Sequence, residues 1–431
     1  MQAHLTRLGL LVLSLVLALL APVVAADARQ LFVAPVAVGR GDGADRDAAA
    51  DFRNTKFWEG INARLAAGPM TVTFLAGSYV VSADPARHQP MLQLTGLGDE
   101  RHPLVIEGER AGAVVFTRHA ADRKLADYPA AERAGLKGPG LFFLVQSRNA
   151  TVRRFTFTAP DVPMGYTTNF AGGRDLTIEN CHWHDLQGVY YGATGTSGAA
   201  TDHVTFKNCR FERVGSGGHA HMIYNAYDAV HIRLVDCHFE DCAGDYVRFR
   251  DSTDYGVVVG CTFRSTGKYL GRHQPFVAMP LFNDDNPAAP KGAPNYEYFG
   301  THFLICHNRF IYESEEKPET RMAVVFHHSG FDPPGRHHLL DRAEALILKD
   351  GAAAERKALL QRNLGIDVAQ VHVFGNEYVR VAHRGVYRCG VSYGAKRRGG
   401  EGSYDIGDLF NAEPVAANAT QALEYFGHGR P

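Results

Sequence analysis

The sequence predicts an all-β solenoid in which short strands stack rung upon rung. The main observation is a motif that recurs four times: an apolar residue, two variable residues, a cysteine, one residue and an aromatic residue. The copies lie at 178–183, 206–211, 234–239 and 258–263. Their cysteines are separated by 28, 28 and 24 positions (209 − 181, 237 − 209 and 261 − 237). A repeat of this length indicates one structural unit stacked along the chain.

Three further segments fit the motif with another residue in the cysteine position. Asn308 and Asn376 occupy it in 305–310 and 373–378, and Phe155 occupies it in 152–157. Equivalent positions of stacked rungs lie above one another, so we expect these residues to form ladders inside the solenoid.

The cysteine ladder is expected to pack the interior rather than to carry redox or metal chemistry. Seven cysteines are present, and none has the C-x-x-C spacing of a zinc site. One disulfide, between Cys237 and Cys242, stays open.

Internal cysteine and asparagine ladders with a period in the twenties resemble the right-handed parallel β-helix of the pectate-lyase-like superfamily. The resemblance covers 70–395 and implies one β-helix domain. A solenoid needs a cap over its first rung, and the amphipathic segment 51–67 predicts a helix suited to that place. Inserts are expected at about 268–299 and 333–365, the second with a helical run at 338–362. The C-terminal segment 396–431 is expected to form a tail or cap.

The N-terminus predicts a signal peptide over 1–26. Arg7 precedes the apolar run 8–20, and small residues follow it at 23–26. A mature protein that is secreted or periplasmic is therefore expected, and no other stretch is apolar enough to span a membrane. With 45 basic and 46 acidic residues the net charge is −1, which gives no support for nucleic-acid binding. We expect a monomer whose partner is an acidic polysaccharide.

Counting back from the ladder cysteines predicts which side chains point outward. The residue 14 places before Cys237 or Cys261 is apolar, so the residue 13 places before is expected to lie on the outer face. That count selects Thr168, Tyr224 and Arg248, and two places further along the strand it selects Phe170, Ala226 and Arg250. Because adjacent rungs lie ~4.8 Å apart, Tyr224 and Arg248 should be neighbours.

Further polar residues stand near the same face. His219, His221 and Asp245 are at the start of these strands, and Tyr190 or Tyr191 is brought in by the preceding rung. Such a group suits β-elimination on a uronic-acid polymer, which needs a cation for the carboxylate, a base and an acid.

We assign Arg248 and Arg250 to the carboxylate, and His221 and Tyr224 to base and acid in either order, with His219 as a further catalytic candidate. Lys268 is an alternative base. Substrate binding is assigned to Tyr190, Tyr191, Asp245, Lys268, His273 and His327.

Segment 246–251 resembles the strand that carries a catalytic arginine in the chondroitinase B and alginate lyase family, and Arg250 matches that arginine. The lysine base of that family would fall near Ala226, so the base must come from elsewhere. Two alternatives to a lyase stay open. One is a glycoside hydrolase that uses Asp245 with Asp284 or Asp285, and the other is a non-catalytic glycan-binding solenoid. The sequence specifies no metal site or cofactor, although Ca²⁺ is left open.

Overall fold

The computed structural model describes the chain from residue 29 to residue 426 with gaps. The described residues are 29–84, 86, 90–133, 135–216, 219–267, 275–283, 299–313, 322–330, 343, 346–347, 350–364, 367–381, 383–389, 402–405 and 410–426. None of the helices among them is long and apolar enough to cross a membrane.

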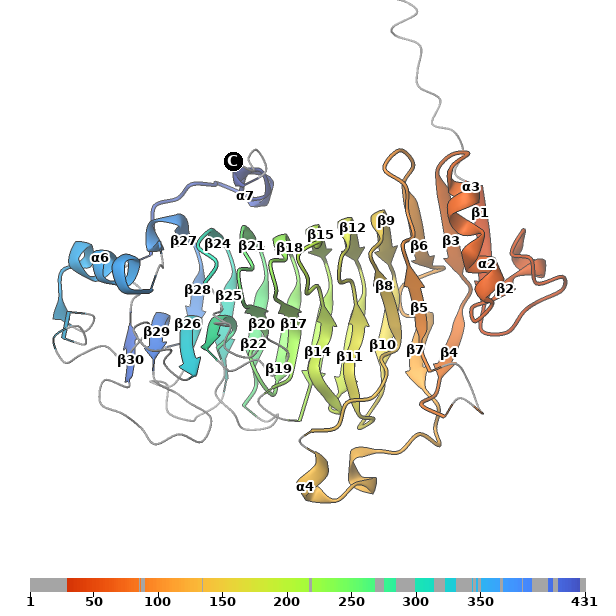
Figure 1. Cartoon of the computed structure of the whole chain (residues 1–431), viewed down its shortest axis with the longest axis horizontal. Coiled ribbons are helices and arrows are strands. Elements are labelled where there is room, and N and C mark those ends of the chain that lie inside the picture. The colour runs from red at the N-terminus through yellow and green to blue at the C-terminus, as the bar shows by residue number, and fades with distance from the viewer. Residues whose placement is uncertain are drawn as a thin grey trace, which may run out of the picture.

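Three long sheets form the sides of one spiral (Figure 1). We call the 11-stranded sheet A, the 9-stranded sheet B and the 10-stranded sheet C. From β3 (Met70–Phe74) onward the chain visits sheet A, then sheet B, then sheet C, and returns to sheet A one rung further on. Neighbouring strands are parallel at each described pairing except that between β29 (His383–Cys389) and β30 (Gly402–Asp405). The predicted all-β solenoid is therefore confirmed as a parallel β-helix.

The strands of each sheet follow in chain order. Sheet A contains β1 (Arg29–Ala34), β2 (Ala50–Asp51), β3 (Met70–Phe74), β6 (Leu104–Gly108), β9 (Arg148–Arg153), β12 (Arg174–Glu179), β15 (Asp202–Lys207), β18 (Val230–Val235), β21 (Gly256–Val259), β24 (Phe303–Cys306) and β27 (Val371–Phe374). Sheet B contains β4 (Gly77–Val81), β7 (Val114–Arg118), β10 (Phe155–Thr158), β13 (His182–Leu186), β16 (Arg210–Val214), β19 (His238–Cys242), β22 (Thr262–Ser265), β25 (Arg309–Tyr312) and β28 (Glu377–Val379). Sheet C contains β5 (Leu92–Thr95), β8 (Phe142–Val145), β11 (Met164–Asn169), β14 (Val189–Gly195), β17 (His221–Asn225), β20 (Val247–Phe249), β23 (Val277–Asn283), β26 (Met322–Gly330), β29 (His383–Cys389) and β30 (Gly402–Asp405).

The helices of the described residues are short, and those labelled in Figure 1 lie outside the spiral of strands. They are η1 (Arg46–Ala48), α2 (Thr55–Glu59), α3 (Ile61–Leu65), η2 (Leu125–Asp127), α4 (Ala130–Arg133), α6 (Ala353–Leu364), η4 (Val368–Gln370) and α7 (Ala419–Tyr425).

The interior ladders form as predicted. The four motif cysteines are buried and unpaired, and so is Cys242, so the disulfide left open between Cys237 and Cys242 is absent. Cys209 Sγ donates to the Ile178 carbonyl of the rung below, at 3.4 Å. Beyond the cysteines, Asn308 Nδ2 donates to Asn376 Oδ1 at 3.0 Å. The motif aromatics stack beside these ladders, with 4.5 Å between the ring centroids of Trp183 and Phe211.

A left-handed residue precedes each ladder cysteine and turns the chain from sheet A to sheet B. Asn180, Asn208, Asp236 and Gly260 have φ between 51° and 69°. Asparagine, aspartate and glycine tolerate this conformation best, which explains why they recur in front of the cysteine.

The segment expected to cap the first rung forms two helices rather than one. Instead of a single helix over 51–67, α2 and α3 meet at Gly60. The Asn54 side chain accepts from the Phe57 N–H and caps α2. Trp58 and Leu65 are buried, and the Trp58 ring stacks on Phe74 of β3 with 5.9 Å between centroids. The capping role of these helices stays a prediction.

One prediction about the second half of the chain needs correction. The expected insert 268–299 contains a rung strand, β23, which pairs with β20 and β26 in sheet C. The sequence did not predict this strand, because it contains Pro280, which is rare inside sheets, and because apolar and polar residues do not alternate along it. The C-terminal segment was expected to form a tail or cap, and its helix α7 packs on the outer face of sheet A against residues such as Val257 and Leu304 (Figure 1), as a tail does. Residues 396–401, 406–409 and 427–431 lie outside the described residues. In the second insert, α6 confirms the C-terminal part of the helical run expected at 338–362, and most of 338–352 lies outside the described residues.

Candidate functional site

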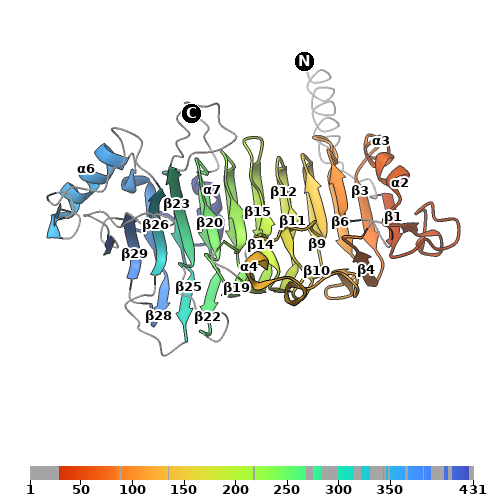
Figure 2. The same cartoon turned by 60° about the horizontal axis from the view of Figure 1, so that its bottom comes forward.

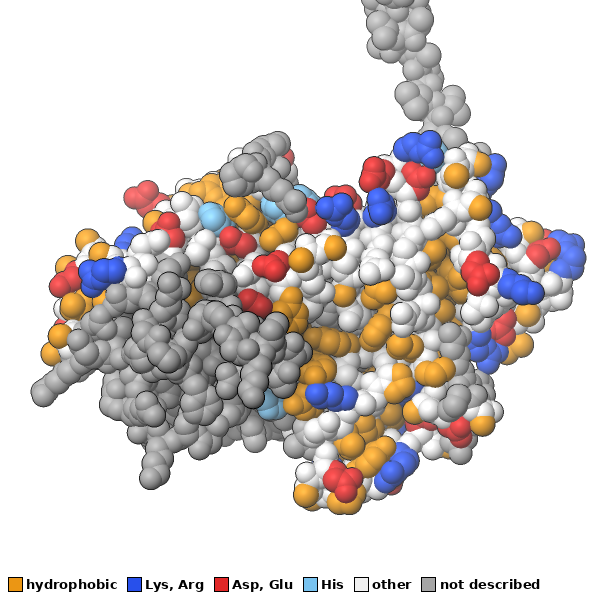
Figure 3. All heavy atoms as spheres, in the orientation of Figure 1, with side chains coloured by type: hydrophobic (Ala, Val, Ile, Leu, Met, Phe, Trp, Pro, Cys, Tyr) orange, Lys and Arg blue, Asp and Glu red, His pale blue; other side chains and the backbone are white. Residues whose placement is uncertain are grey.

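The outer face of sheet C collects tyrosines, histidines and cations in the middle of the solenoid. We call Tyr166, Tyr190, Tyr191 and Tyr224 the tyrosine cluster. In Figure 3 hydrophobic side chains, among which tyrosine is counted, gather there above the α4 segment. Figure 2 shows that segment lying beside β11 and β14, and the Gly165 N–H donates to the Gly138 carbonyl at 2.8 Å.

Strand register confirms part of the predicted face and corrects the rest. Tyr224 lies opposite Arg248 on the next rung, as expected. Thr168 does not lie in that column, because it pairs with Thr194 and is fully buried. Its neighbour Asn169 lies in the column instead, since the turn from sheet C to sheet A is one residue shorter on that rung (181 − 169 against 237 − 224).

The prediction that Phe170 and Ala226 point outward is also wrong. Both side chains have 0% exposure, and Phe170 packs edge-on against Phe206 in the core. Alternation cannot be extended to these residues because β11 ends at Asn169 and β17 ends at Asn225. Of the three residues selected at that position, Arg250 alone keeps partial exposure.

A β-bulge in β17 places His221 beside Tyr224. The N–H groups of Met222 and Ile223 both donate to the Tyr246 carbonyl at 3.0 Å, which is the pattern of a bulge. Met222 and Ile223 both join the core. Regular alternation would put His221 and Tyr224 on opposite faces, whereas the bulge leaves their ring centroids 5.4 Å apart.

His221 is a buried neutral imidazole. Its Nδ1 lies 3.2 Å from the Asp245 carbonyl oxygen, which assigns the ring proton to Nδ1. Nε2 is buried without a hydrogen-bond partner among the described residues. Burial, and then the nearby Arg248, holds the pKa of His221 well below its usual range. Nε2 therefore carries a lone pair at neutral pH.

His219 is the accessible histidine of the site. Its ring stacks on Tyr190 with 5.5 Å between centroids and 18° between planes. The side chain remains exposed, yet its neighbours partly desolvate the ring. This desolvation, together with the positive charges of Arg248 and Lys137, lowers the pKa of His219. His219 is therefore neutral, and able to accept a proton, at neutral pH.

Lys137 was missed by sequence reasoning. It comes from the loop after α4, and its Nζ donates to the Tyr191 hydroxyl at 2.5 Å. The ammonium also lies 4.6 Å from the ring centroids of both Tyr190 and Tyr191. The hydrogen bond to Tyr191 raises the pKa of Lys137, so this side chain is a cation and not a base at neutral pH. Lys137 lies in a loop outside the repeated motif, 54 residues from Tyr191 in the sequence, so the repeat spacing could not predict this contact.

The two predicted arginines are held differently. Arg248 is buried, and its Nε donates to Asp245 Oδ2 at 2.8 Å while a second nitrogen approaches the same oxygen. Arg250 is half-buried, and its Nη1 donates to the Tyr224 hydroxyl at 2.9 Å. The Tyr224 oxygen accepts this bond, so its own proton can be directed elsewhere. Arg248 orients the site from within, while Arg250 is the arginine that a ligand can reach.

Tyr166 forms the floor of the tyrosine cluster. Its ring stacks on Tyr191 at 5.3 Å and meets Tyr224 edge-on at 6.1 Å. Two glycines of β14 make room for the ring, since a Cβ on Gly195 would come within 2.8 Å of it. Burial raises the pKa of Tyr166 above its usual range, which keeps this phenol neutral.

The remaining candidates are not joined to this site by any described contact. Lys268, His273, Asp284 and Asp285 lie outside the described residues. His327 lies on β26, where its backbone pairs with Pro280, but its side chain is not among those described.

Two further groups of side chains could hold a metal ion. They are Asp202 with His203 and His231, and Glu212 with His238 and Glu240. Within each group the possible ligand atoms lie within 4.8 Å of one another. The first group lies on sheet A and the second on sheet B, so neither belongs to the tyrosine cluster. The sequence predicted neither.

Comparison with known proteins agrees with the fold. Residues 138–276 match the family described as a right handed beta helix region. Among solved structures the chain is similar to an alginate lyase from Paenibacillus sp., with 10% identity over 64% of this chain and 91% of that chain (TM-score 0.39). It is also similar to the pectate lyase Pel9A, with 14% identity over 88% of this chain and 74% of that chain (TM-score 0.38).

A third similar structure is PfbA, a surface adhesin of Streptococcus pneumoniae, with 14% identity over 69% of this chain and 80% of that chain (TM-score 0.38). No curated protein is significantly similar in sequence. At these identities and TM-scores, no conclusion about this chain rests on the solved structures. With three sheets wound in one spiral and a family match over its centre, the chain is a right-handed parallel β-helix protein.

Proposed function

We propose that this chain is an exported polysaccharide lyase that cleaves a uronic-acid polymer by β-elimination at the tyrosine cluster. One observation carries the proposal: two cations, Lys137 and Arg250, each donate to a phenol of a face that also presents a neutral, accessible histidine. β-Elimination needs these three kinds of group together.

The cations have the role of neutralising the substrate carboxylate. A uronate becomes more acidic at C5 when a positive charge approaches its carboxylate, because the charge stabilises the enolate-like intermediate. Lys137 and Arg250 are both charged at neutral pH, and Arg250 offers planar donors suited to a carboxylate. Arg248, engaged with Asp245, holds the face in place.

Proton transfer is assigned to His219 and Tyr224. His219 accepts the C5 proton, the C4–O bond breaks, and a C4=C5 double bond forms. Tyr224, whose oxygen already accepts from Arg250, donates its proton to the leaving oxygen. His221 lies beneath with 0% exposure, so it positions Tyr224 rather than touching the substrate.

A glycan-binding protein without catalysis is the second candidate. Tyr190 and Tyr191 are half-exposed, and aromatic faces stack well on sugar rings. The hydrolase alternative is weaker, because Asp245 is buried and ion-paired with Arg248. Because of this ion pair, the Asp245 carboxylate is not available for the acid–base role that the hydrolase mechanism assigned to it.

The test is a panel of alginate, pectate, ulvan and glycosaminoglycans, read by ultraviolet absorbance and by reducing ends. A lyase raises both signals, because each elimination creates a conjugated double bond, which absorbs ultraviolet light, and a new reducing end. Reducing ends without absorbance would indicate a hydrolase, and binding with neither signal a binding protein. Both of the latter results contradict the proposal.

Variants assign the roles once a substrate is found. His219→Ala should lower kcat/KM by about 10²–10⁴-fold, and Tyr224→Phe should lower kcat with little change in KM. His238→Ala, on sheet B, is the matched control and should retain activity. Normal turnover by both site variants would refute the assignment.

A further inference from the structure

We propose that Asp202, His203 and His231 bind a divalent transition-metal ion of the zinc class on the outer face of sheet A. This site is separate from the tyrosine cluster, which lies on sheet C. The inference does not rest on the proposed lyase activity.

The regular register of sheet A brings the two imidazoles together. Asp202 lies opposite Val230 on the next rung, so His203 and His231 occupy equivalent places in β15 and β18. Both have φ of 54°, a left-handed conformation that few residues adopt. Their rings stack with 4.3 Å between centroids and 20° between planes. The backbone of two paired strands thus holds both side chains in one arrangement.

The donor atoms converge on a single point. Asp202 Oδ1 lies 2.7 Å from His203 Nδ1 and 2.8 Å from His231 Nδ1. Two nitrogens and one carboxylate oxygen form a ligand set that suits Zn²⁺ and its neighbours in the first transition series. A metal ion can replace the shared hydrogen-bonding arrangement because all three atoms already lie close together.

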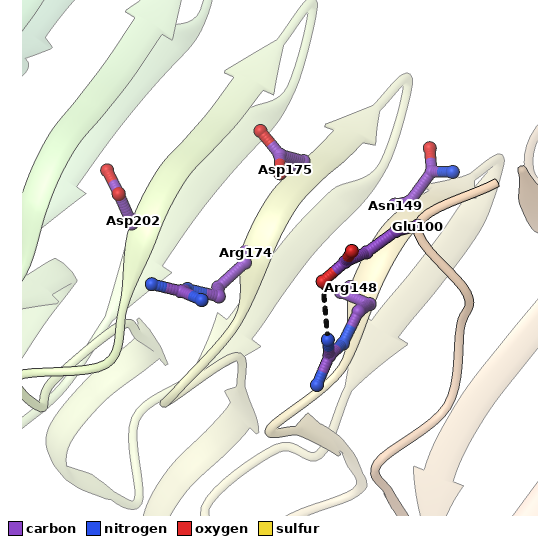
Figure 4. A pocket seen from close by; sticks show the side chains of 6 residues that line it. All are labelled: Glu100, Arg148, Asn149, Arg174, Asp175 and Asp202. Carbon is purple, nitrogen blue, oxygen red and sulfur yellow. Dashed lines mark hydrogen bonds and ion pairs between the residues drawn. The ribbon is translucent and has the colours of Figure 1, made fainter.

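The site is preorganised but reachable. The side-chain exposures are 4% for His231, 15% for Asp202 and 34% for His203. Two ligands are therefore held by packing, and the third opens to solvent. Asp202 also lines a hollow of about 490 Å³ with Arg148 and Arg174 (Figure 4). Water from this side can complete the coordination sphere.

Two nearby arrangements show what the proposed site has in addition. Further along the same ladder, His302 Nδ1 lies 2.9 Å from Asp254 Oδ2, but its stacking neighbour is Tyr255 rather than a second histidine. In the group on sheet B, Glu212 pairs with Arg210 and Glu240 pairs with Arg264. Those arginines neutralise the carboxylates that a metal ion would need.

The experiment is titration of the metal-free full chain with Zn²⁺ by calorimetry, and with Co²⁺ by visible absorption. His203→Asn and His231→Asn are the test variants, because asparagine tolerates the left-handed backbone. His302→Asn is the matched control from the same ladder. Thermal unfolding of each variant without metal checks that the rungs remain folded.

The wild type should bind one Zn²⁺ and unfold at a higher temperature when the ion is present. Each test variant should bind at least tenfold more weakly, and His302→Asn should bind as the wild type does. If His231→Asn fails to fold, the affinity of His203→Asn for Zn²⁺ decides the test, because the His203 side chain is the more exposed of the two. Binding that survives both substitutions, or no binding by the wild type at millimolar Zn²⁺, would overturn the proposal.

Discussion

The interior of the solenoid and the outer face of sheet C are built on opposite principles. Inside, the same residue types recur at the same place on each rung, as in the stack of Trp183, Phe211 and Phe239. On the outer face of sheet C, a bulge in β17 and a loop residue, Lys137, bring together side chains that share no period. Regular register produces ladders that stabilise the fold, whereas local irregularity produces a group of unlike side chains that can do chemistry.

The largest expected effect tests the interior. Phe211→Ala should lower the free energy of unfolding by about 3–5 kcal/mol, because the ring is fully buried and stacked on both sides. Tyr227→Ala is the matched aromatic control, since that side chain is 47% exposed, and should change stability little. Urea denaturation measures both. Equal losses would break the distinction between interior and surface.

The next effect tests the outer face. Lys137→Ala should lower kcat/KM on a uronate polymer by roughly 10–100-fold, because one of the cations at the carboxylate is lost, and should leave thermal unfolding unchanged. Lys137→Arg should restore part of the activity. The control is Lys207→Ala on the exposed side of β15. If Lys137→Ala kept full activity, Lys137 would have no role in the site.

A smaller effect is expected where backbone and site meet. Gly195→Ala should displace Tyr166, because the added Cβ would come within 2.8 Å of its ring. We expect a cost of about 1–3 kcal/mol and a loss of activity of several-fold. Gly135→Ala is the control, as its Cβ would meet nothing nearer than 4.0 Å. Unchanged near-ultraviolet circular dichroism and activity in Gly195→Ala would show that the stack of Tyr166 and Tyr191 is not needed.

The smallest effect concerns pH. The pKa of His221 is held well below its usual value by burial. As the pH falls below about 6.5, the His221 imidazole binds a proton in the unfolded chain but not in the folded chain. The free energy of unfolding therefore decreases toward acid pH. His221→Gln should remove this part of the decrease, seen as a flatter plot of unfolding free energy against pH. A plot as steep as that of the wild type would show that His221 is not the group responsible.

Part of the outer face was predictable because it follows the period of the interior. Tyr224 and Arg248 both stand 13 residues before a ladder cysteine, so they occupy the same place on adjacent rungs and are neighbours. Thr168 was misplaced because a turn on its rung is shorter by one residue, and β23 was missed because Pro280 interrupts its pattern. A turn that is shorter by one residue leaves a weak trace in the apolar pattern, yet it shifts the register of a whole strand. Pro280 hides β23 in the pattern but leaves its register with β26 unbroken.

The sequence by itself determined the interior of this protein. The recurring cysteine, asparagine and aromatic positions specify which side chains stack inward, because stacked rungs repeat every environment at a constant interval. The sequence also predicted the pairing of Tyr224 with Arg248, but only the tertiary structure decided which other side chains join them. A bulge places His221 beside Tyr224. Lys137 contacts Tyr191, which is 54 residues away in the sequence. His203 and His231 both contact one carboxylate oxygen, that of Asp202. These contacts depend on local backbone geometry and on the path of a loop, and neither has a period that a sequence can display.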